Sequence, residues 1–364
     1  MKKYRAAIVG LSEMGARPMP SGSVNPALGV EWEPFHAAMA VSHASAFAVS
    51  PNVEVVAVCD LKEELLKGFL ANFQSIWPGV RTYTDFGKML ADEKPDLLGV
   101  ATSDHLHTQI VVDAAEAGVR GILLEKPMAT NLADADRMIE ACERHGVAVS
   151  VDNFRRFRPH WNGALTQFGD GPLGEVRRIV GSYGGPRSML FRNGSHLIDA
   201  IAWFAGGEPE WVVGALDEEH QEYGPRSIGD GGHTEELDPG GSALLQFDNG
   251  VRAFINISKR TAAELELDVF AEGGRLRINN QSAEVSSPLP DVLPPVMVSR
   301  TLPVPMTQRT DTPAAIADII QGIEQGRDTV SPPRQARKSL EIILGILQSQ
   351  AAGTTPVRFP IHDV

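Results

Sequence analysis

The chain has 364 residues, of which 43% are hydrophobic and 22% are charged, as is ordinary for a folded globular protein. Its length favours two domains over a single hydrophobic core. The formal net charge of −13 argues against a surface that binds nucleic acid or an anionic membrane, because both need clustered positive charge.

The chain carries few signals of targeting or of a disulfide framework. Only two cysteines occur, Cys59 and Cys142, far apart and outside any metal-ligand spacing. We therefore predict buried thiols in a reducing compartment and no metal site. The basic N-terminus precedes an apolar patch that is too short for a signal peptide, and no apolar run reaches membrane-spanning length. We expect a cytoplasmic protein.

The first 150 residues alternate between strand-like and helix-like segments. Nearly continuous apolar runs, typical of strands buried on both faces, occur at residues 4–10, 53–60, 97–102, 121–124 and 147–151. Between them, apolar residues recur at helical spacing over residues 62–73, 107–118 and 131–146. Strands that alternate with helices through short connections predict right-handed βαβ units and a parallel sheet.

After residue 152 the pattern changes. Residues 174–184, 240–258 and 265–279 show strand-like alternation, and Asp248-Asn249-Gly250 is a strong hairpin signal. Helical patterns occur near residues 194–204 and from residue 312 onward. We predict an N-terminal domain over residues 1–152 and a mostly antiparallel sheet with a few helices over residues 153–364.

A glycine loop follows the first predicted strand. Gly10 and Gly15 occupy the first and third glycine positions of the dinucleotide-binding fingerprint, with Ser12 at the second and Met14 just before the third. Serine is small enough for this position, and its hydroxyl could donate to a phosphate. Without further context, an ordinary strand-to-turn connection explains these residues about equally well.

An acidic residue, Asp60, ends the second predicted strand. A carboxylate there can accept hydrogen bonds from the ribose hydroxyls and repel a 2′-phosphate, although it could also cap the following helix. Asp60 lies 45 residues after Gly15, where the fingerprint expects about 20. The surplus predicts an insertion at about residues 17–42, which could cover the cofactor, shape the substrate cleft or contact another subunit.

These features together resemble the Gfo/Idh/MocA family of sugar and polyol dehydrogenases. The residues that carry the resemblance are GLSEMG, HASAFAVSPNVEVVAVCD, the Glu125-Lys126-Pro127 motif with its flanking helices, and GSHLID at residues 194–199. The resemblance implies an α/β fold: a doubly wound Rossmann domain that binds NAD or NADP, then an α/β domain with a large, open, mostly antiparallel sheet. Asp60 favours NAD over NADP. It also implies a small carbohydrate substrate and a homodimer or homotetramer formed through that sheet.

The family resemblance assigns roles to single residues. It places the nicotinamide beside Lys126, with Glu125 orienting the amine or the ribose hydroxyls and with Thr102 and His107 also lining the cofactor site. It makes His196 the general base for the substrate hydroxyl, with Lys126 stabilising the developing alkoxide. Asp199 shares a helix face with His196 and would orient the site.

Two features point to an anionic substrate. Arg192, followed by Asn193, stands where many family members carry an aspartate, and its charge would lower the pKa of the nearby histidine. Either the substrate supplies a negative charge or the usual arrangement of the base is altered. Arg155, Arg156 and Arg158 place three cations within four residues after the last Rossmann strand. They could bind a uronate carboxylate or a sugar phosphate, or they could belong to a solvated hinge with ordinary salt bridges.

Three functions are compatible with these residues. The first is an NAD-dependent dehydrogenase that takes hydride from a carbinol carbon. The second is an enzyme that retains NAD and cleaves glycosides through transient oxidation, elimination and re-reduction, without net NADH. The third is a non-catalytic sensor or scaffold, which retention of Lys126 and His196 disfavours.

Overall fold

The computed structural model describes residues 3–18, 40–217, 238–262, 264–303 and 311–361. Within these ranges the chain forms two compact units. Residues up to 157 and residues 311–336 make the first unit, and the remaining described residues make the second. Among the described residues, no helix is long and apolar enough to cross a membrane.

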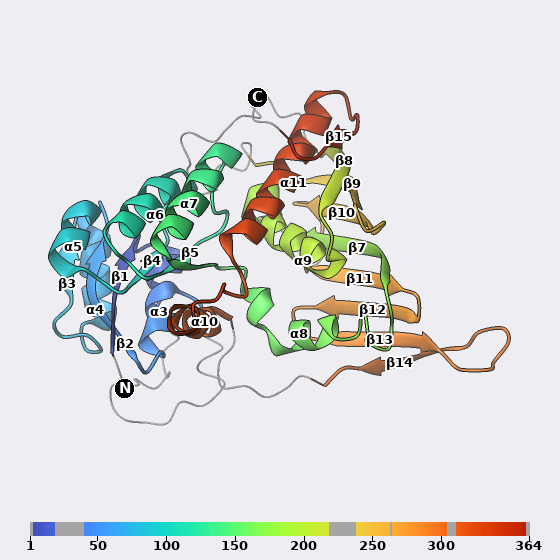
Figure 1. The fold of residues 1–364 in the computed structure, drawn as a ribbon, viewed down its shortest axis with the longest axis horizontal. Coiled ribbons are helices and arrows are strands. Elements are labelled where there is room, and N and C mark those ends of the chain that lie inside the picture. Colours follow the sequence, from blue (N-terminus) through green and yellow to red (C-terminus); the bar gives the residue numbers. More distant parts are fainter. Residues whose placement is uncertain (1–2, 19–39, 218–237, 263, 304–310, 362–364) are drawn as a thin grey trace. The chain divides into compact units, whose positions relative to one another are not determined.

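The first unit contains a six-stranded parallel sheet in the order β3-β2-β1-β4-β5-β6 (Figure 1). Its strands are β1 (Tyr4–Val9), β2 (Val53–Cys59), β3 (Arg81–Tyr83), β4 (Leu97–Val100), β5 (Gly121–Leu124) and β6 (Ala148–Val151). The order reverses between β1 and β4, so the carboxyl ends of these two strands flank a topological switch point, where open α/β sheets bind ligands. The predicted doubly wound parallel sheet is confirmed.

Helices connect these strands. They are α1 (Glu13–Ala16), α3 (His43–Ala48), α4 (Glu63–Phe73), α5 (Phe86–Glu93), the 3₁₀ turn η2 (Asp104–Leu106), α6 (His107–Glu116) and α7 (Leu132–His145). Local signals set several of their ends. At the start of α7, the Asn131 side chain accepts a hydrogen bond from the Asp134 amide at 2.8 Å, and the helix stops at Gly146, whose φ is +66°.

Most of the predicted insertion, residues 19–39, lies outside the described residues. Its two flanks meet, because the Ser42 hydroxyl donates to the Arg17 carbonyl at 2.7 Å. Ser42 also caps α3 by accepting a hydrogen bond from the Ser45 amide. Residues 17 and 42 therefore lie next to each other, as expected for an insertion at one point of the fold.

The chain returns to the first unit late in the sequence with α10 (Asp311–Gln325). Ile319 and Ile323 lie where a side chain at Gly121 would be, so α10 packs directly on β5. The Thr312 hydroxyl donates to the Asp152 carboxylate at 3.0 Å, and the Tyr4 hydroxyl donates to Glu324 at 3.0 Å. The predicted boundary at residue 152 does not anticipate this return.

The second unit is built on a nine-stranded sheet in the order β14-β13-β12-β11-β7-β10-β9-β8-β15. Its strands are β7 (Val176–Gly184), β8 (Pro209–Leu216), β9 (Gly241–Phe247), β10 (Arg252–Ser258), β11 (Glu266–Ala271), β12 (Gly274–Asn279), β13 (Ala283–Pro288), β14 (Met297–Thr301) and β15 (Val357–Arg358). Only β7 and β10 pair in parallel; the other neighbours are antiparallel. The predicted mostly antiparallel sheet and the hairpin at Asp248-Asn249-Gly250 are confirmed.

Helices cover one face of this sheet. The elements are α8 (Pro159–Leu165), the π-helical turn η4 (Leu190–Gly194), α9 (Ser195–Ala205) and α11 (Pro333–Ala351), whose first residues belong to the first unit. Gly181 of β7 leaves room for Leu197 and Ile201 of α9, because a Cβ on Gly181 would lie about 3 Å from each of these side chains. On the sheet, Phe254 of β10 and Val180 of β7 are paired and exposed, at 46% and 38%.

Candidate cofactor and active site

The glycine loop follows β1 at the switch point. Gly10 has a φ of +87°, and a Cβ on it would lie 2.5 Å from the Ala101 carbonyl oxygen. A Cβ on Gly15 would lie 1.9 Å from the Gly10 carbonyl oxygen. Both positions therefore require glycine for close backbone approach. Ser12 is the N-cap residue of α1, but its side chain makes no capping hydrogen bond. Contact of Ser12 and Met14 with a cofactor stays a prediction.

Asp60 lies beside this loop at the end of β2. One carboxylate oxygen accepts a hydrogen bond from the Leu11 amide at 2.8 Å, and the other accepts from the Lys62 amide at 2.9 Å. Asp60 thus joins the glycine loop to the start of α4. A carboxylate has about four acceptor positions, and the half-buried Asp60 keeps some of them for a ligand.

His107 lies buried between the ends of β4 and β5. Its Nε2 lies 3.2 Å from the Thr102 carbonyl oxygen, and its Nδ1 lies 3.1 Å from the Pro127 carbonyl oxygen. Burial lowers the pKa of His107 below its ordinary value, although the negative charge of Asp104 opposes this. The ring therefore lies between the loop after β4 and the backbone that follows Lys126. Direct contact of Thr102 and His107 with a cofactor stays a prediction.

The Glu125-Lys126-Pro127 motif follows β5, and the bond between Lys126 and Pro127 is cis. The Lys126 side chain is only partly buried, whereas Glu125 is 7% exposed. Oε1 of Glu125 lies 3.3 Å from Nε2 of His43 on α3. Burial acts to raise the pKa of Glu125, but the adjacent His43 ring and the charge of Lys126 hold it below its ordinary value. The carboxylate is therefore ionised at neutral pH.

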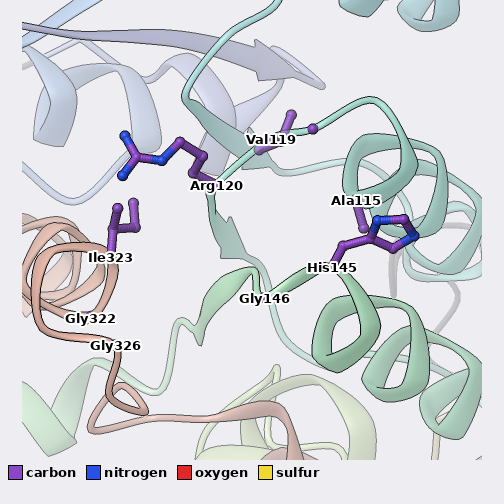
Figure 2. Close-up of a pocket in the computed structure, with 9 residues that line it drawn as sticks. Ala115, Val119, Arg120, His145, Gly146, Gly322, Ile323 and Gly326 are labelled. Atoms are coloured by element: carbon purple, nitrogen blue, oxygen red, sulfur yellow. The ribbon is translucent and has the colours of Figure 1, made fainter.

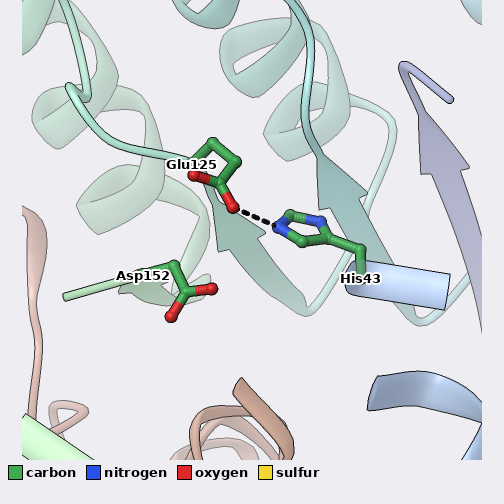
Figure 3. A group of neighbouring side chains, drawn as sticks. All are labelled: His43, Glu125 and Asp152. Carbon is green, nitrogen blue, oxygen red and sulfur yellow. Dashed lines mark ion pairs between the residues drawn. The ribbon is translucent and has the colours of Figure 1, made fainter. Parts of the chain in front are cut away.

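Two residues next to Glu125 were not predicted from the sequence. They are His43, at the first position of α3, and Asp152, directly after β6 (Figure 3). Burial, together with the negative charges of Glu125 and Asp311, raises the pKa of Asp152 well above its ordinary value. The only available signal for Asp152 was its position after a predicted parallel strand, at the same sheet edge as Glu125.

In the second unit, α9 carries the predicted base His196, and η4 precedes it with Arg192 and Asn193. The amides of Phe191 and Arg192 each donate at 3.0 Å to the buried carboxylate of Asp238, which fixes the turn before α9. His196 and Asp199 are both buried on α9. Asp238 was not predicted from the sequence, because it lies 42 residues after His196 and has no local motif.

The three clustered arginines differ in their surroundings. Arg155 and Arg156 lie in the 3₁₀ turn η3 (Phe154–Phe157) of the first unit and are 3% and 4% exposed, which contradicts the alternative of a solvated hinge. The Arg155 guanidinium lies 4.6 Å from the centroid of the Phe154 ring. Arg158 begins the second unit and donates to Asn280 at 3.4 Å. Anion binding by these arginines, by Arg192 and by Asn193 stays a prediction.

Lys126 belongs to the first unit and His196 to the second. Lys126 lies in the loop that follows β5, and His196 lies on α9. That the two groups face each other across one cleft stays a prediction.

A cavity of about 300 Å³ in the first unit lies elsewhere (Figure 2). Arg120 and Gly146 line it. Arg120 directly precedes β5 and Gly146 lies two residues before β6, so the cavity lies at the amino ends of these strands. The glycine loop, Lys126 and Asp152 lie at the carboxyl ends. The cavity is therefore separate from the candidate site.

Comparisons with known proteins agree with this architecture. Residues 36–153 match the model of an oxidoreductase family with an NAD-binding Rossmann fold, GFO_IDH_MocA, and residues 166–277 match the GFO/IDH/MocA C-terminal domain. A D-apiose dehydrogenase from Paraburkholderia graminis is 37% identical over 36% of this chain, but the match spans only 34% of that enzyme. A myo-inositol 2-dehydrogenase from Thermotoga maritima is 25% identical over 65% of this chain and 71% of its own length.

A solved structure shares the fold over nearly the whole chain. It is the WlbA dehydrogenase from Bordetella pertussis in complex with NADH and UDP-GlcNAcA. Its TM-score is 0.71 at 19% identity, and the match covers 99% of this chain and 100% of the other.

Proposed function

Because this chain belongs to the Gfo/Idh/MocA family of oxidoreductases, we propose that it is an NAD-dependent dehydrogenase that oxidises a hydroxyl group of a sugar, a polyol or a sugar derivative. One observation carries the proposal: Lys126 and its ionised neighbour Glu125 follow β5, at the sheet edge that holds the glycine loop and Asp60. Ligands of open parallel sheets bind at this edge.

The residues at the switch point fit a dinucleotide. Gly10 and Gly15 make a cradle that a Cβ would fill, so only glycine leaves the loop backbone in this position. Asp60 is held by two backbone amides and can accept hydrogen bonds from ribose hydroxyls. Its negative charge would repel a 2′-phosphate, which favours NAD over NADP. Bound NAD supplies the hydride acceptor.

The proposed chemistry divides between the two units. His196 takes the proton of the substrate hydroxyl, and the hydrogen on the same carbon leaves as hydride, so that a carbonyl forms. Lys126 donates a hydrogen bond to the oxygen and stabilises its negative charge in the transition state. Asp199 orients the imidazole or the substrate. His107 supports the loop around Lys126, as its contacts with the carbonyl oxygens of Thr102 and Pro127 indicate.

We propose that the substrate carries a carboxylate or a phosphate. The buried guanidinium groups of Arg155 and Arg156 and the half-buried side chains of Arg192 and Asn193 support this proposal. Guanidinium groups bind planar anions through paired hydrogen bonds. A panel of matched neutral and acidic sugars, assayed for NADH formation, tests it. Faster turnover of the neutral members would contradict it.

The central experiment is the substitution Lys126→Met, assayed on the best substrate of that panel. We expect kcat to fall by about 10²–10³-fold, as for loss of one oxyanion donor, with the Kd for NAD little changed. Lys67→Met, on the exposed face of α4, is the matched control and should leave kcat unchanged. Unchanged turnover by Lys126→Met would refute the assigned role. Product formation without net NADH would instead favour the redox-neutral glycoside-cleaving mechanism.

We further propose a cytoplasmic homodimer or homotetramer formed through the nine-stranded sheet. Its support is the exposed pair of Phe254 and Val180 on neighbouring strands, since exposed apolar patches on a sheet mark interfaces. The two cysteines are buried free thiols, which fits a reducing compartment. Sedimentation equilibrium of the wild type and of Phe254→Arg tests the assembly. A monomeric wild type would contradict it.

A further inference from the structure

Three side chains that could ligate a metal converge inside the first unit. His43 comes from the start of α3, Glu125 from the end of β5 and Asp152 from the end of β6 (Figure 3). Each offers one ligand atom, and these atoms all lie within 4.8 Å of one another. The residues are 0%, 7% and 3% exposed, so the cluster is shielded from solvent.

Several polar atoms of this cluster have no hydrogen-bond partner among the described residues. They are both ring nitrogens of His43, Oε1 of Glu125 and Oδ1 of Asp152. Buried polar atoms are nearly always hydrogen-bonded, and a native exception calls for an explanation such as an ion. Asp152 uses only its other oxygen, which accepts the hydrogen bond from Thr312. Buried polar atoms without hydrogen-bond partners therefore come together here from three separate elements.

The contact between His43 and Glu125 has the spacing of two ligands of one ion. Their Nε2 and Oε1 atoms form an ion pair at 3.3 Å, but the contact does not have the geometry of a hydrogen bond. Tetrahedral Zn²⁺ sites have metal–ligand distances of about 2.0–2.1 Å, which places neighbouring ligand atoms about 3.3 Å apart. The ligand atom of Asp152 lies within 4.8 Å of the other two.

We propose that His43, Glu125 and Asp152 bind one divalent transition-metal ion of the Zn²⁺ or Mn²⁺ class. One imidazole nitrogen with two carboxylate oxygens suits these ions better than Ca²⁺ or Mg²⁺, which take oxygen ligands. The ion would join α3 to the ends of β5 and β6 and so brace the loop that carries Lys126. The proposed metal site does not depend on the proposed dehydrogenase reaction, because metal binding can be measured without catalysis.

The test is calorimetric titration of the untagged full-length chain, stripped with a chelator, with ZnCl₂, MnCl₂ and MgCl₂ in separate arms. We expect one Zn²⁺ or Mn²⁺ per chain and a higher Tm with the ion bound. Asp152→Asn and His43→Gln should each weaken binding by at least about tenfold, in the range seen for altered metal sites. His145→Gln removes a solvent-exposed histidine and should bind like the wild type.

Two results would overturn the metal site. One is the absence of stoichiometric Zn²⁺ or Mn²⁺ binding to the wild type, which would make the cluster a buried ion pair with a protonated aspartate. The other is wild-type affinity in the Asp152→Asn variant. The amide oxygen that this substitution introduces can still accept the hydrogen bond from Thr312, so the variant remains testable if His43→Gln does not fold. Neither result depends on NAD turnover, so the proposed function can fail or stand separately.

Discussion

The substitution Gly10→Ala tests the close approach of the glycine loop to the end of β4. Gly10 and Gly118 share a φ of +87°, but a Cβ at Gly118 would meet nothing within 4 Å. Gly118→Ala is therefore a control in which the new methyl group causes backbone strain but no steric clash. That strain costs about 1–2 kcal/mol, and loss of unfolded-chain entropy offsets about 0.4–1 kcal/mol. We expect Gly118→Ala to lower the free energy of unfolding by about 1 kcal/mol.

At Gly10 the new Cβ would also lie 2.5 Å from the Ala101 carbonyl oxygen and 2.8 Å from the Thr102 amide nitrogen. These are backbone atoms, which cannot rotate away as a side chain would. Overpacking of this kind adds about 1–3 kcal/mol, so Gly10→Ala should cost about 2–4 kcal/mol in total. Because the loop must move to relieve the contact, we also expect the Kd for NAD to rise at least about tenfold, whereas Gly118→Ala leaves it unchanged.

Urea unfolding followed by circular dichroism measures the first quantity, and calorimetric titration with NAD measures the second. Both variants and the wild type should be compared in the same buffer. If Gly10→Ala and Gly118→Ala have equal unfolding free energies and equal affinities for NAD, then the loop does not lie against β4 as the structure shows, and the placement of the cofactor at this loop is wrong.

Three further predictions concern the carboxylates. Asp60→Asn removes the charge that repels a 2′-phosphate. Fluorescence titrations should therefore show NAD binding about tenfold weaker and NADP binding stronger relative to NAD. An unchanged ratio of the Kd values for NAD and NADP would contradict the role of Asp60. Since folding raises the pKa of Asp152, the stability of the wild type falls as pH rises from that group's ordinary value toward its raised one. Asp152→Asn should therefore gain stability over the wild type with rising pH, in urea unfolding with a chelator present, and a pH-independent difference would disprove the raised pKa. Asp238→Ala leaves the amides of Phe191 and Arg192 without their acceptor, which should lower the free energy of unfolding by about 1.5–3 kcal/mol. It should also lower kcat without changing the Kd for NAD. A fall in NAD affinity would argue against the role of Asp238 in holding the turn before α9.

Local patterns predicted most of the first unit. The apolar runs of β1, β2, β4, β5 and β6 are buried on both faces, so their sequences show the burial directly. By contrast, β3 was missed because it has three residues with mostly exposed side chains, and α5 was missed with it. The order of elements then fixed the parallel sheet, because βαβ connections are right-handed.

Sequence motifs also predicted candidate site residues. Gly10 and Gly15 were found from their spacing after a strand, Asp60 from its place at the end of the second predicted strand, and Lys126 from the Glu125-Lys126-Pro127 motif of the family resemblance. These signals are local, since they depend on backbone conformation and on the ends of neighbouring strands. The residues that contact these motifs were not predicted from local signals. His43, which contacts Glu125, is an example.

What the sequence by itself determined is therefore the order and type of the main elements, the doubly wound sheet and the chain positions of the glycine loop and Lys126. The tertiary structure alone decided that α10 returns to the first unit, that Arg155 and Arg156 are buried, and that His43, Glu125 and Asp152 meet. The physical reason is that burial of a charged side chain depends on groups that approach from distant segments. No local periodicity encodes that approach, because it is set by the packing of whole elements.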